Sequence, residues 1–392
     1  MKRFVAIALV FGFVLVGCPE MSDNPQVKNY IVTFDADNGS NNTMQTVNEG
    51  GTVNESTPPT KANDMAGLYA GTPPTNYTFD GWYKGETKWN FTSDTVSEDI
   101  TLTAKWIAPS TIDLASVSGN NVVEKTVSYV NANSGSEYTL VLETDVPNVE
   151  PQTLDQNNTA LTITSNSNTE RKIILGNTNG SLFTVGGIYL GDGNWEPRSA
   201  KLIIDGYITL QGRKDNSGAL VNIRYGGNSD LKGFTKIIGN YGSPYGGGIY
   251  ANGSSGTGAG VSITMSGNAE ISGNTNLVTA GLGGAGVIIT GGNTIFTMSD
   301  NAIIKNNSTD DDGGGVGLGF GATFIMNGGE ITDNSAANGG GVSIVPFGTF
   351  VVANEQILLG IHDNTASDGA QNVSKFAANG IFTVGGIDWD NF

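Results

Sequence analysis

Short runs in which apolar and polar residues alternate make up most of the chain, and such alternation is typical of half-buried β-strands. The run Tyr30–Asp35 shows this pattern near the start, and Val261–Met265 and Phe324–Met326 show it further along. Turn signals rich in glycine and asparagine separate the runs. The pattern therefore predicts an all-β protein.

The second half of the chain repeats one unit. Five copies of the motif Ile-x-x-Asn follow one another at intervals of 27 to 34 residues, and a glycine cluster and two alternating runs lie between successive copies. The copies are Ile237–Asn240, Ile271–Asn274, Ile304–Asn307, Ile331–Asn334 and Ile361–Asn364. One period is too small to bury its apolar residues alone, whereas stacked coils share a continuous core.

The turns between these strands need backbone conformations with positive φ, which glycine adopts freely and asparagine tolerates best among the other residues. Three strands in each period of about 30 residues, with Gly and Asn at the corners, predict a parallel β-helix in which each Ile of the motif points inward. A β-sandwich with glycine-rich turns is the alternative.

The sequence style GGG-V…F-x-M-x-G-G-x-I-x-x-N resembles the repeats of bacterial polymorphic outer-membrane and adhesin-like proteins. The predicted coil is similar to the pectin-lyase-like right-handed β-helix. The resemblance covers residues 230–370 well and residues 127–229 more loosely, through LTITSN, RKIILGN and AKLIIDGYITLQG. It implies a right-handed parallel β-helix over residues 127–392. Polysaccharide lyases and hydrolases share this fold, so the resemblance alone leaves enzyme function open.

An aromatic-rich unit precedes the repeats, at residues 29–107. The string VTFDADNG…PTK…YTFDGWYKGETKWNFTSDTVSEDITLTAKW resembles the Listeria–Bacteroides repeat, also called the internalin B-repeat. The resemblance implies a small β-grasp-like module of the kind found in surface proteins. Thr57–Thr60 recurs as Thr72–Thr75, which indicates an insertion of about 15 residues, and a single copy is present. Residues 108–126 are predicted to be a linker.

The N-terminus combines positive charge with a short apolar run. Lys2 and Arg3 precede the run from Phe4 to Val16, which is shorter than the roughly 20 residues needed to span a bilayer. Residues 1–17 therefore have the pattern of a signal peptide. The run ends at Gly17-Cys18, which resembles the lipobox of bacterial lipoproteins and implies cleavage before Cys18 and diacylation of that residue. An ordinary signal peptide with an incidental cysteine is the alternative.

Cys18 is the only cysteine of the 392 residues, so the mature chain has no internal disulfide. Residues 18–28 are polar and contain two prolines, as expected of a lipidated tether. Two acyl chains suffice for stable anchoring. We expect an exported lipoprotein, attached to the membrane through Cys18 and exposed on the cell surface.

Charge and composition limit the classes of partner. The formal net charge is −18, and loss of Lys2 and Arg3 with the signal peptide would make it more negative still. A field of this sign repels phosphate backbones, so we expect no nucleic-acid partner. Only 14% of residues are charged, while 57 are glycine, which is typical of a turn-rich β protein with an uncharged polar surface.

The residues that chemistry would need are scarce in the repeats. Lys305 is the only Lys or Arg between Asn240 and Asp368, although a polysaccharide lyase needs a basic residue to remove a proton. The sole histidine, His362, is predicted to be a solvent-facing turn residue. Asp310–Asp312 has the oxygen ligands that calcium prefers but lacks an EF-hand pattern, and is predicted to be a solvated turn. The glycine clusters lack a following Lys-Ser/Thr and are not phosphate loops.

These features predict a surface protein that is not an enzyme and has no catalytic residue, metal or other cofactor. Its role would be adhesion or envelope structure, and its ligand a host or cell-surface protein or glycan. A carbohydrate-binding or carbohydrate-active protein is the alternative. Tyr241, Tyr245 and Tyr250 are candidates for stacking on sugar rings, against the competing interpretation that they pack at a coil edge. The sequence does not single out the ligand-binding residues.

Acylation of Cys18 is directly testable. Metabolic labelling with an alkyne analogue of palmitate should mark the wild-type protein, because the lipobox delivers the Cys18 thiol to the acylating enzyme. The Cys18→Ser variant should stay unlabelled. Equal labelling of the two proteins would show that Cys18 is not the anchor.

Overall fold

The computed structural model describes residues 27–61, 77–107, 111–113, 121–165, 167–242, 245–253, 258–277, 283–367, 369, 371–375 and 379–388. Cys18, the predicted signal peptide and most of the tether lie outside these residues, as does most of the predicted insertion before residue 77. The chain divides into two compact units, one built from residues up to Lys61 together with Phe79–Trp106, and the other containing residues from Ile107 onward.

The N-terminal unit is a five-stranded mixed sheet with strand order β2-β1-β5-β3-β4. Its strands are β1 Asn29–Asp35, β2 Thr43–Asn48, β3 Thr78–Lys84, β4 Thr87–Lys88 and β5 Ile100–Ile107. The central pair, β1 and β5, is parallel. Alternation along β5 buries Ile100, Leu102 and Ala104 on one face, as predicted, with Trp106 partly buried beside them. The rings of Phe34 and Trp82 meet edge to face, with centroids 4.9 Å apart.

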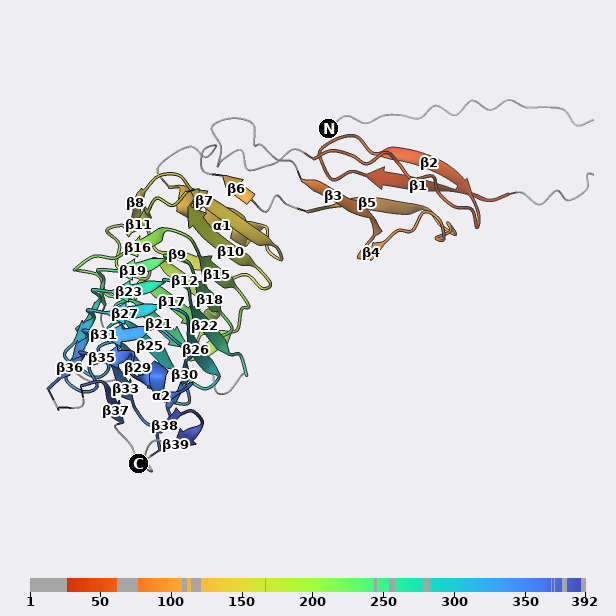
Figure 1. The fold of residues 1–392 in the computed structure, drawn as a ribbon. Coiled ribbons are helices and arrows are strands. Elements are labelled where there is room, and N and C mark those ends of the chain that lie inside the picture. The colour runs from red at the N-terminus through yellow and green to blue at the C-terminus, as the bar shows by residue number, and fades with distance from the viewer. Residues whose placement is uncertain are drawn as a thin grey trace, which may run out of the picture. The chain divides into compact units, whose positions relative to one another are not determined.

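The second unit is a parallel β-helix, which confirms the predicted solenoid and excludes the β-sandwich. Its coils stack between α1 and β39 (Figure 1). Three long sheets, called S1, S2 and S3 here, run along the stack. S1 comprises β6 Thr111–Asp113, β7 Glu137–Leu142, β10 Ala160–Ser165, β15 Lys201–Ile204, β18 Asn228–Leu231, β22 Val261–Met265, β26 Thr294–Met298, β30 Thr323–Met326, β34 Thr349–Val352, β38 Ile381–Val384 and β39 Ile387–Asp388.

Each full coil contributes one strand to S1, then one to S2 and then one to S3. S2 comprises β8 Val146–Val149, β11 Arg171–Leu175, β16 Ile208–Gln211, β19 Lys236–Ile238, β23 Glu270–Ser272, β27 Ile303–Lys305, β31 Glu330–Thr332 and β35 Ile361–His362. S3 comprises β9 Gln152–Leu154, β12 Phe183–Gly186, β17 Val221–Arg224, β21 Ile249–Asn252, β25 Val287–Thr290, β29 Val316–Gly319, β33 Val342–Ile344 and β37 Val373–Lys375. A short sheet, S4, comprises β20 Tyr241–Gly242, β24 Thr275–Asn276, β28 Ser308–Thr309, β32 Ser335–Ala336 and β36 Thr365–Ala366.

Like residues stack upon like in the core. The isoleucines of the five motif copies are buried, as predicted, and the register places Ile304 beside Ile331 and Ile331 beside Ile361. In S1 the rings of Phe296, Phe324, Phe350 and Phe382 form one continuous stack, with successive centroids 4.8 to 5.1 Å apart. Each coil thus buries its apolar residues against the equivalent residues of its neighbours, as the repeat requires.

The asparagines of the motif form a buried ladder. The Asn307 amide Nδ2 donates to the backbone carbonyl of Ile271 at 3.0 Å and to Asn334 Oδ1 at 2.9 Å. Asn307 Oδ1 accepts from the backbone N–H and the side-chain Nδ2 of Asn274, at 3.0 and 3.1 Å. Asn274, Asn334 and Asn364 bond in the same way within the stack.

The ladder corrects the role predicted for these asparagines. They are buried hydrogen-bonding groups, and the positive φ of the turn belongs to the preceding residue, which is Gly239, Gly273, Asn306, Asp333 or Asp363 with φ between 53° and 65°. Each side-chain amide forms hydrogen bonds with backbone groups that would otherwise be buried without partners.

The glycine clusters have two roles. Their first members, such as Gly313 and Gly339, have positive φ, as predicted for turns. The last members approach the next coil too closely for a side chain: a Cβ at Gly315 would lie 2.5 Å from the Gly341 carbonyl oxygen and 3.1 Å from Asn334 Nδ2. The asparagine ladder can therefore form only where the last residue of each glycine cluster has no side chain.

The described parts of the segment predicted to be a linker, residues 111–113 and 121–126, belong to the solenoid. Strand β6 pairs with β7 in S1, and the helix α1, Val122–Ala132, begins within the segment. Val123, Val127 and Val130 recur at helical spacing and are buried in the solenoid core. They form a helix despite their β-branched side chains, because α1 covers the end of the core beside β8 and β9.

Removing one step of the ladder should destabilise the solenoid strongly. The variant Asn307→Ala leaves the carbonyl of Ile271 and the backbone N–H of Asn274 without their side-chain partners, and each such buried group costs about 1–3 kcal/mol. We expect a loss of more than about 3 kcal/mol in chemical denaturation. Asn306→Gly is the matched control, since Asn306 is exposed with φ of 53° and should change stability by less than about 1 kcal/mol. Equal midpoints for the two variants would contradict the role of the ladder.

Candidate functional site

The outer face of S3 carries a cluster of aromatic rings on its early coils. Along β17 the alternation turns Val221 and Ile223 into the core, where both are fully buried, and Asn222 and Arg224 outward. The register aligns Asn222 with Thr184 on one side and Tyr250 on the other. The stack therefore fixes the relative positions of outward side chains from successive coils.

A hairpin inserted after β12 brings further rings to this face. Strands β13, Ile188–Gly191, and β14, Asn194–Glu196, pair antiparallel, with Tyr189 opposite Trp195. The Trp195 ring stacks on Tyr225 with centroids 4.5 Å apart, and Tyr189 lies 5.0 Å from Trp195 at a tilt of 49°. Tyr189 is 54% exposed, so one end of this stack is open to solvent.

Glycines and a strained residue make this approach of the hairpin possible. A Cβ at Gly186 would lie 2.0 Å from the Arg224 carbonyl oxygen, and one at Gly187 would lie 2.6 Å from Tyr225 Cβ. Tyr225 itself has φ of 40°, an uncommon conformation for a bulky residue. Such strain costs on the order of 1–3 kcal/mol and clusters at functional sites. Here it turns the Tyr225 ring toward Trp195.

Tyr245 and Tyr250 extend the cluster. Their centroids lie 4.9 Å apart, and Tyr245 is 55% exposed. Burial, followed by the nearby Tyr245 and Tyr225 hydroxyls, raises the pKa of Tyr250 to about 12, so its hydroxyl stays protonated at neutral pH. We call Tyr189, Trp195, Tyr225, Tyr245 and Tyr250, together with Asn222 and Arg224, the aromatic surface.

Two polar atoms of the aromatic surface are buried without a partner. Asn222 Oδ1 and Arg224 Nε make no hydrogen bond, although the protein covers both atoms. Buried polar groups are almost always paired, so unpaired ones need an explanation such as a ligand or water. A guanidinium and a protonated tyrosine hydroxyl beside aromatic rings suit a ligand with both hydroxyl groups and a C–H face.

The sequence identified part of this surface and missed the rest. Tyr245 and Tyr250 pack against each other, which fits packing at a coil edge as well as sugar stacking, whereas Tyr241 lies on β20 with Lys214 Nζ 6.0 Å from its ring centroid. Tyr189, Trp195 and Tyr225 were missed because their coils match the repeat only loosely. The available signal was the turn Gly191-Asp192-Gly193, which places Trp195 in a hairpin that the repeat does not require.

His362 and Lys305 occupy surface positions on S2. Lys305 Nζ pairs with Glu270 at 3.2 Å. His362 lies on β35, with its side chain 42% exposed, Nδ1 2.9 Å from Asp363 and Nε2 3.8 Å from Glu330. The hydrogen bond to the Asp363 carboxylate raises the pKa of His362, and burial opposes this only in part.

Asp310–Asp312 is less solvated than predicted. Asp312 is buried and its Oδ1 accepts from Asn338 Nδ2 at 2.6 Å, because this turn bridges to the next coil at Asn338. Burial and the neighbouring Asp312 carboxylate raise the pKa of Asp311. Across the described ranges, no three His, Cys, Asp or Glu side chains gather as they would around a metal ion.

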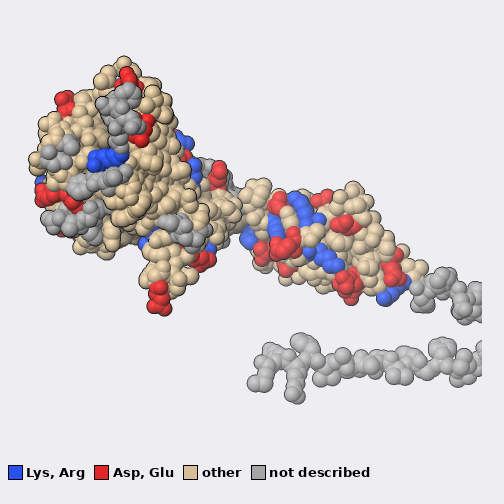
Figure 2. Space-filling model, turned by 90° about the horizontal axis from the view of Figure 1, so that it is seen from below, with Lys and Arg blue, Asp and Glu red and all other residues tan. Residues whose placement is uncertain are grey.

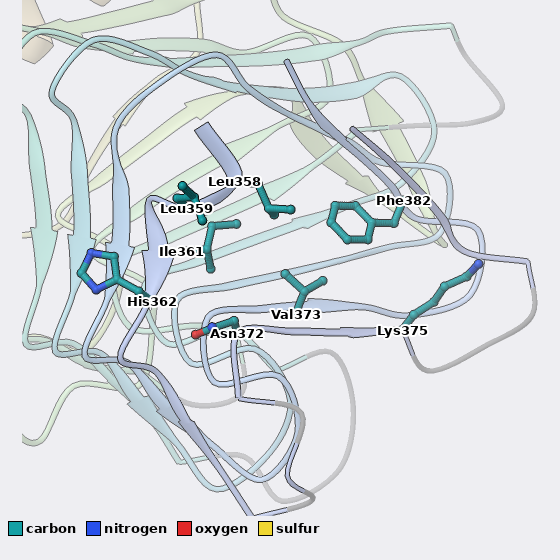
Figure 3. Close-up of a pocket in the computed structure, with 8 residues that line it drawn as sticks. All are labelled: Leu358, Leu359, Ile361, His362, Asn372, Val373, Lys375 and Phe382. Atoms are coloured by element: carbon teal, nitrogen blue, oxygen red, sulfur yellow. The ribbon is translucent and has the colours of Figure 1, made fainter. Parts of the chain in front are cut away.

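A cavity of about 590 Å³ lies at the C-terminal end of the solenoid. It is lined by Leu358, Leu359, Ile361, His362, Asn372, Val373, Lys375 and Phe382 (Figure 3). Leu358 belongs to the short helix α2, Glu355–Leu358. The apolar side chains face one another, while His362 and Lys375 lie toward opposite sides. This is the end of the apolar core rather than a site with converging polar groups.

These features define a class of protein, a small mixed β module followed by a parallel β-helix with an aromatic surface. A family model described as the Listeria-Bacteroides repeat domain matches residues 30–65 and 69–105, so the N-terminal unit is a module of that family. No curated protein and no solved structure matches the chain significantly. Among the described residues, no helix has the length and apolar character needed to cross a membrane.

The pKa of His362 gives a pH-dependent test of its surroundings. Because Asp363 raises the folded-state pKa above 6.5, protonated His362 stabilises the fold below that pH, and the contribution is lost as pH rises through the folded pKa. His362 is the only histidine, so nuclear magnetic resonance of its ring protons reports its pKa directly. Asp363→Asn should lower that pKa, whereas Asp310→Asn, an equal charge change elsewhere, should not. A wild-type pKa at or below 6.5 would contradict the assigned geometry.

Proposed function

We propose that this protein is an exported, lipid-anchored surface protein that adheres to glycans through the aromatic surface of its solenoid. The observation that carries the proposal is the aromatic surface, where exposed rings adjoin unpartnered polar atoms. Aromatic rings stack on the C–H faces of sugars, and the polar atoms between them suit sugar hydroxyl groups. The anchor would be acyl chains on Cys18.

The N-terminal module supports a location outside the cell. Modules that resemble it occur in surface proteins, and here it lies between the lipidation motif and the solenoid in the sequence. A tether at Cys18 would then place the module before the solenoid along the path from the membrane. Adhesion fits this order, because the ligand-binding coils follow the anchor and the module.

Glycan binding should depend on Trp195. In a glycan array probed with the full chain in detergent, Trp195→Ala should weaken binding of the bound glycans by about tenfold or more, the effect of losing a central aromatic anchor. Phe234→Ala is the matched control, because Phe234 is a 44% exposed ring that stacks on Tyr207 outside the aromatic surface. Absence of glycan binding by the wild type, or equal binding by both variants, would refute the proposal.

The proposal also predicts no cleavage of the bound sugar. The repeats hold one basic residue between Asn240 and Asp368, Lys305, and Glu270 neutralises it at 3.2 Å. Incubation with pectins and related polysaccharides should release neither unsaturated nor reducing ends. Release that a point mutation abolishes would favour a carbohydrate-active enzyme instead.

A further inference from the structure

Arg224 is a half-buried cation that the described protein leaves without a counter-ion. Its guanidinium carbon lies 5.0 Å from the centroid of the Trp195 ring, and it forms no ion pair with any residue the structure describes. Burial is the main cause that lowers the pKa of Arg224, although an arginine remains charged at neutral pH. Burial of a charge without a partner is costly, so an anion at this position would be stabilised.

Some nearby basic side chains have carboxylate partners. Lys201 and Lys232 both contact Asp230, at 2.7 and 3.5 Å, and Arg198 contacts Glu196 at 2.9 Å. Arg171, Lys172 and Lys214 of the same coils, like Arg224, form no ion pair with a described residue, so the feature that distinguishes Arg224 is its contact with the Trp195 ring in the aromatic surface.

The geometry leaves the binding edge of Arg224 available. A guanidinium that lies against an aromatic face uses its π surface, while its N–H groups radiate in the plane and can bind a carboxylate with two parallel hydrogen bonds. Asn222 lies two residues away on the same face of β17, with Oδ1 unpartnered. The protein covers Asn222 Oδ1 and Arg224 Nε, so the Nη groups of Arg224 are the donors that remain for an anion.

The charge distribution along the solenoid favours an anion at these coils and not further on. Residues 170–236 hold nine Lys and Arg against six Asp and Glu, whereas residues 237–392 hold two against twelve. Figure 2, which looks toward the C-terminal end of the solenoid, shows acidic side chains at several places around this end. The strongly negative chain thus concentrates positive charge on the coils that carry Arg224.

We propose that Arg224 binds the carboxylate of an acidic sugar whose ring stacks on the Tyr189–Trp195–Tyr225 rings. This inference rests on the proposed glycan adhesion and names its ligand class. Arg224 raises the affinity for acidic sugars over neutral ones, while the aromatic rings bind both.

Matched pairs of sugars that differ only in esterification of their carboxylates test the proposal. Calorimetry on the full chain in detergent would compare 3′-sialyllactose with its methyl ester, and trigalacturonate with its methyl ester. At least one acidic sugar should bind about tenfold or more tightly than its neutral partner, and the preference should shrink in high salt. Arg224→Gln should abolish the preference. The matched control Arg171→Gln removes one arginine from β11 in S2 and should leave the preference for the acidic sugar unchanged.

The outcomes separate the two proposals. Equal binding of acidic and neutral partners, still dependent on Trp195, would overturn the role of Arg224 and leave glycan adhesion standing. Absence of binding to all four sugars overturns the acidic-sugar assignment, and absence across the whole array overturns adhesion as well.

Discussion

The buried ladder of asparagine amides fixes the register of the solenoid, and the other features of the stack depend on that register. Each amide bonds both to the backbone of one neighbouring coil and to the amide of the other, so a shift of one residue would break bonds on both sides at once. With the register fixed, isoleucine columns and the phenylalanine stack align without further specification. Apolar burial supplies much of the stabilisation, and the ladder determines which coils meet in which alignment.

A fixed register also turns a repetitive scaffold into a surface with defined geometry. Outward residues on S3 recur at the strand spacing, so side chains that are about 30 residues apart in sequence become neighbours, as Asn222 and Tyr250 do. The coils that carry the aromatic surface differ from the regular repeat in two ways. The β13–β14 hairpin projects from the coil, and Tyr225 has a strained backbone. Because the rigid stack of coils positions the hairpin and Tyr225, these residues form a more precisely defined binding surface than a free loop would.

The distribution of charged residues also differs between the later, regular coils and the earlier coils that carry the aromatic surface. The later coils are acidic and regular, which favours solubility and discourages association with phosphate-rich polymers. The earlier coils hold several ion pairs, and Arg224 lies among them against an aromatic ring without a carboxylate partner. A single cation against an aromatic ring can attract an anionic group locally while the whole protein stays strongly negative, because solvent screens distant charges within about 8 Å at physiological ionic strength.

The sequence alone determined the all-β class, the module at residues 29–107 and the inward isoleucines, because these follow from alternation and spacing that a reader can count. It could not show that Asn307 is buried while Asn306 has the positive φ, since both residues tolerate that conformation and only stacking decides which amide meets the next coil. Nor could it place α1, whose valines favour strands until the open end of the core offers them burial. The aromatic surface joins the β13–β14 hairpin, β17 and β21 with the residues beside them, and Trp195, Tyr225 and Tyr250 are neighbours only because the coils are stacked.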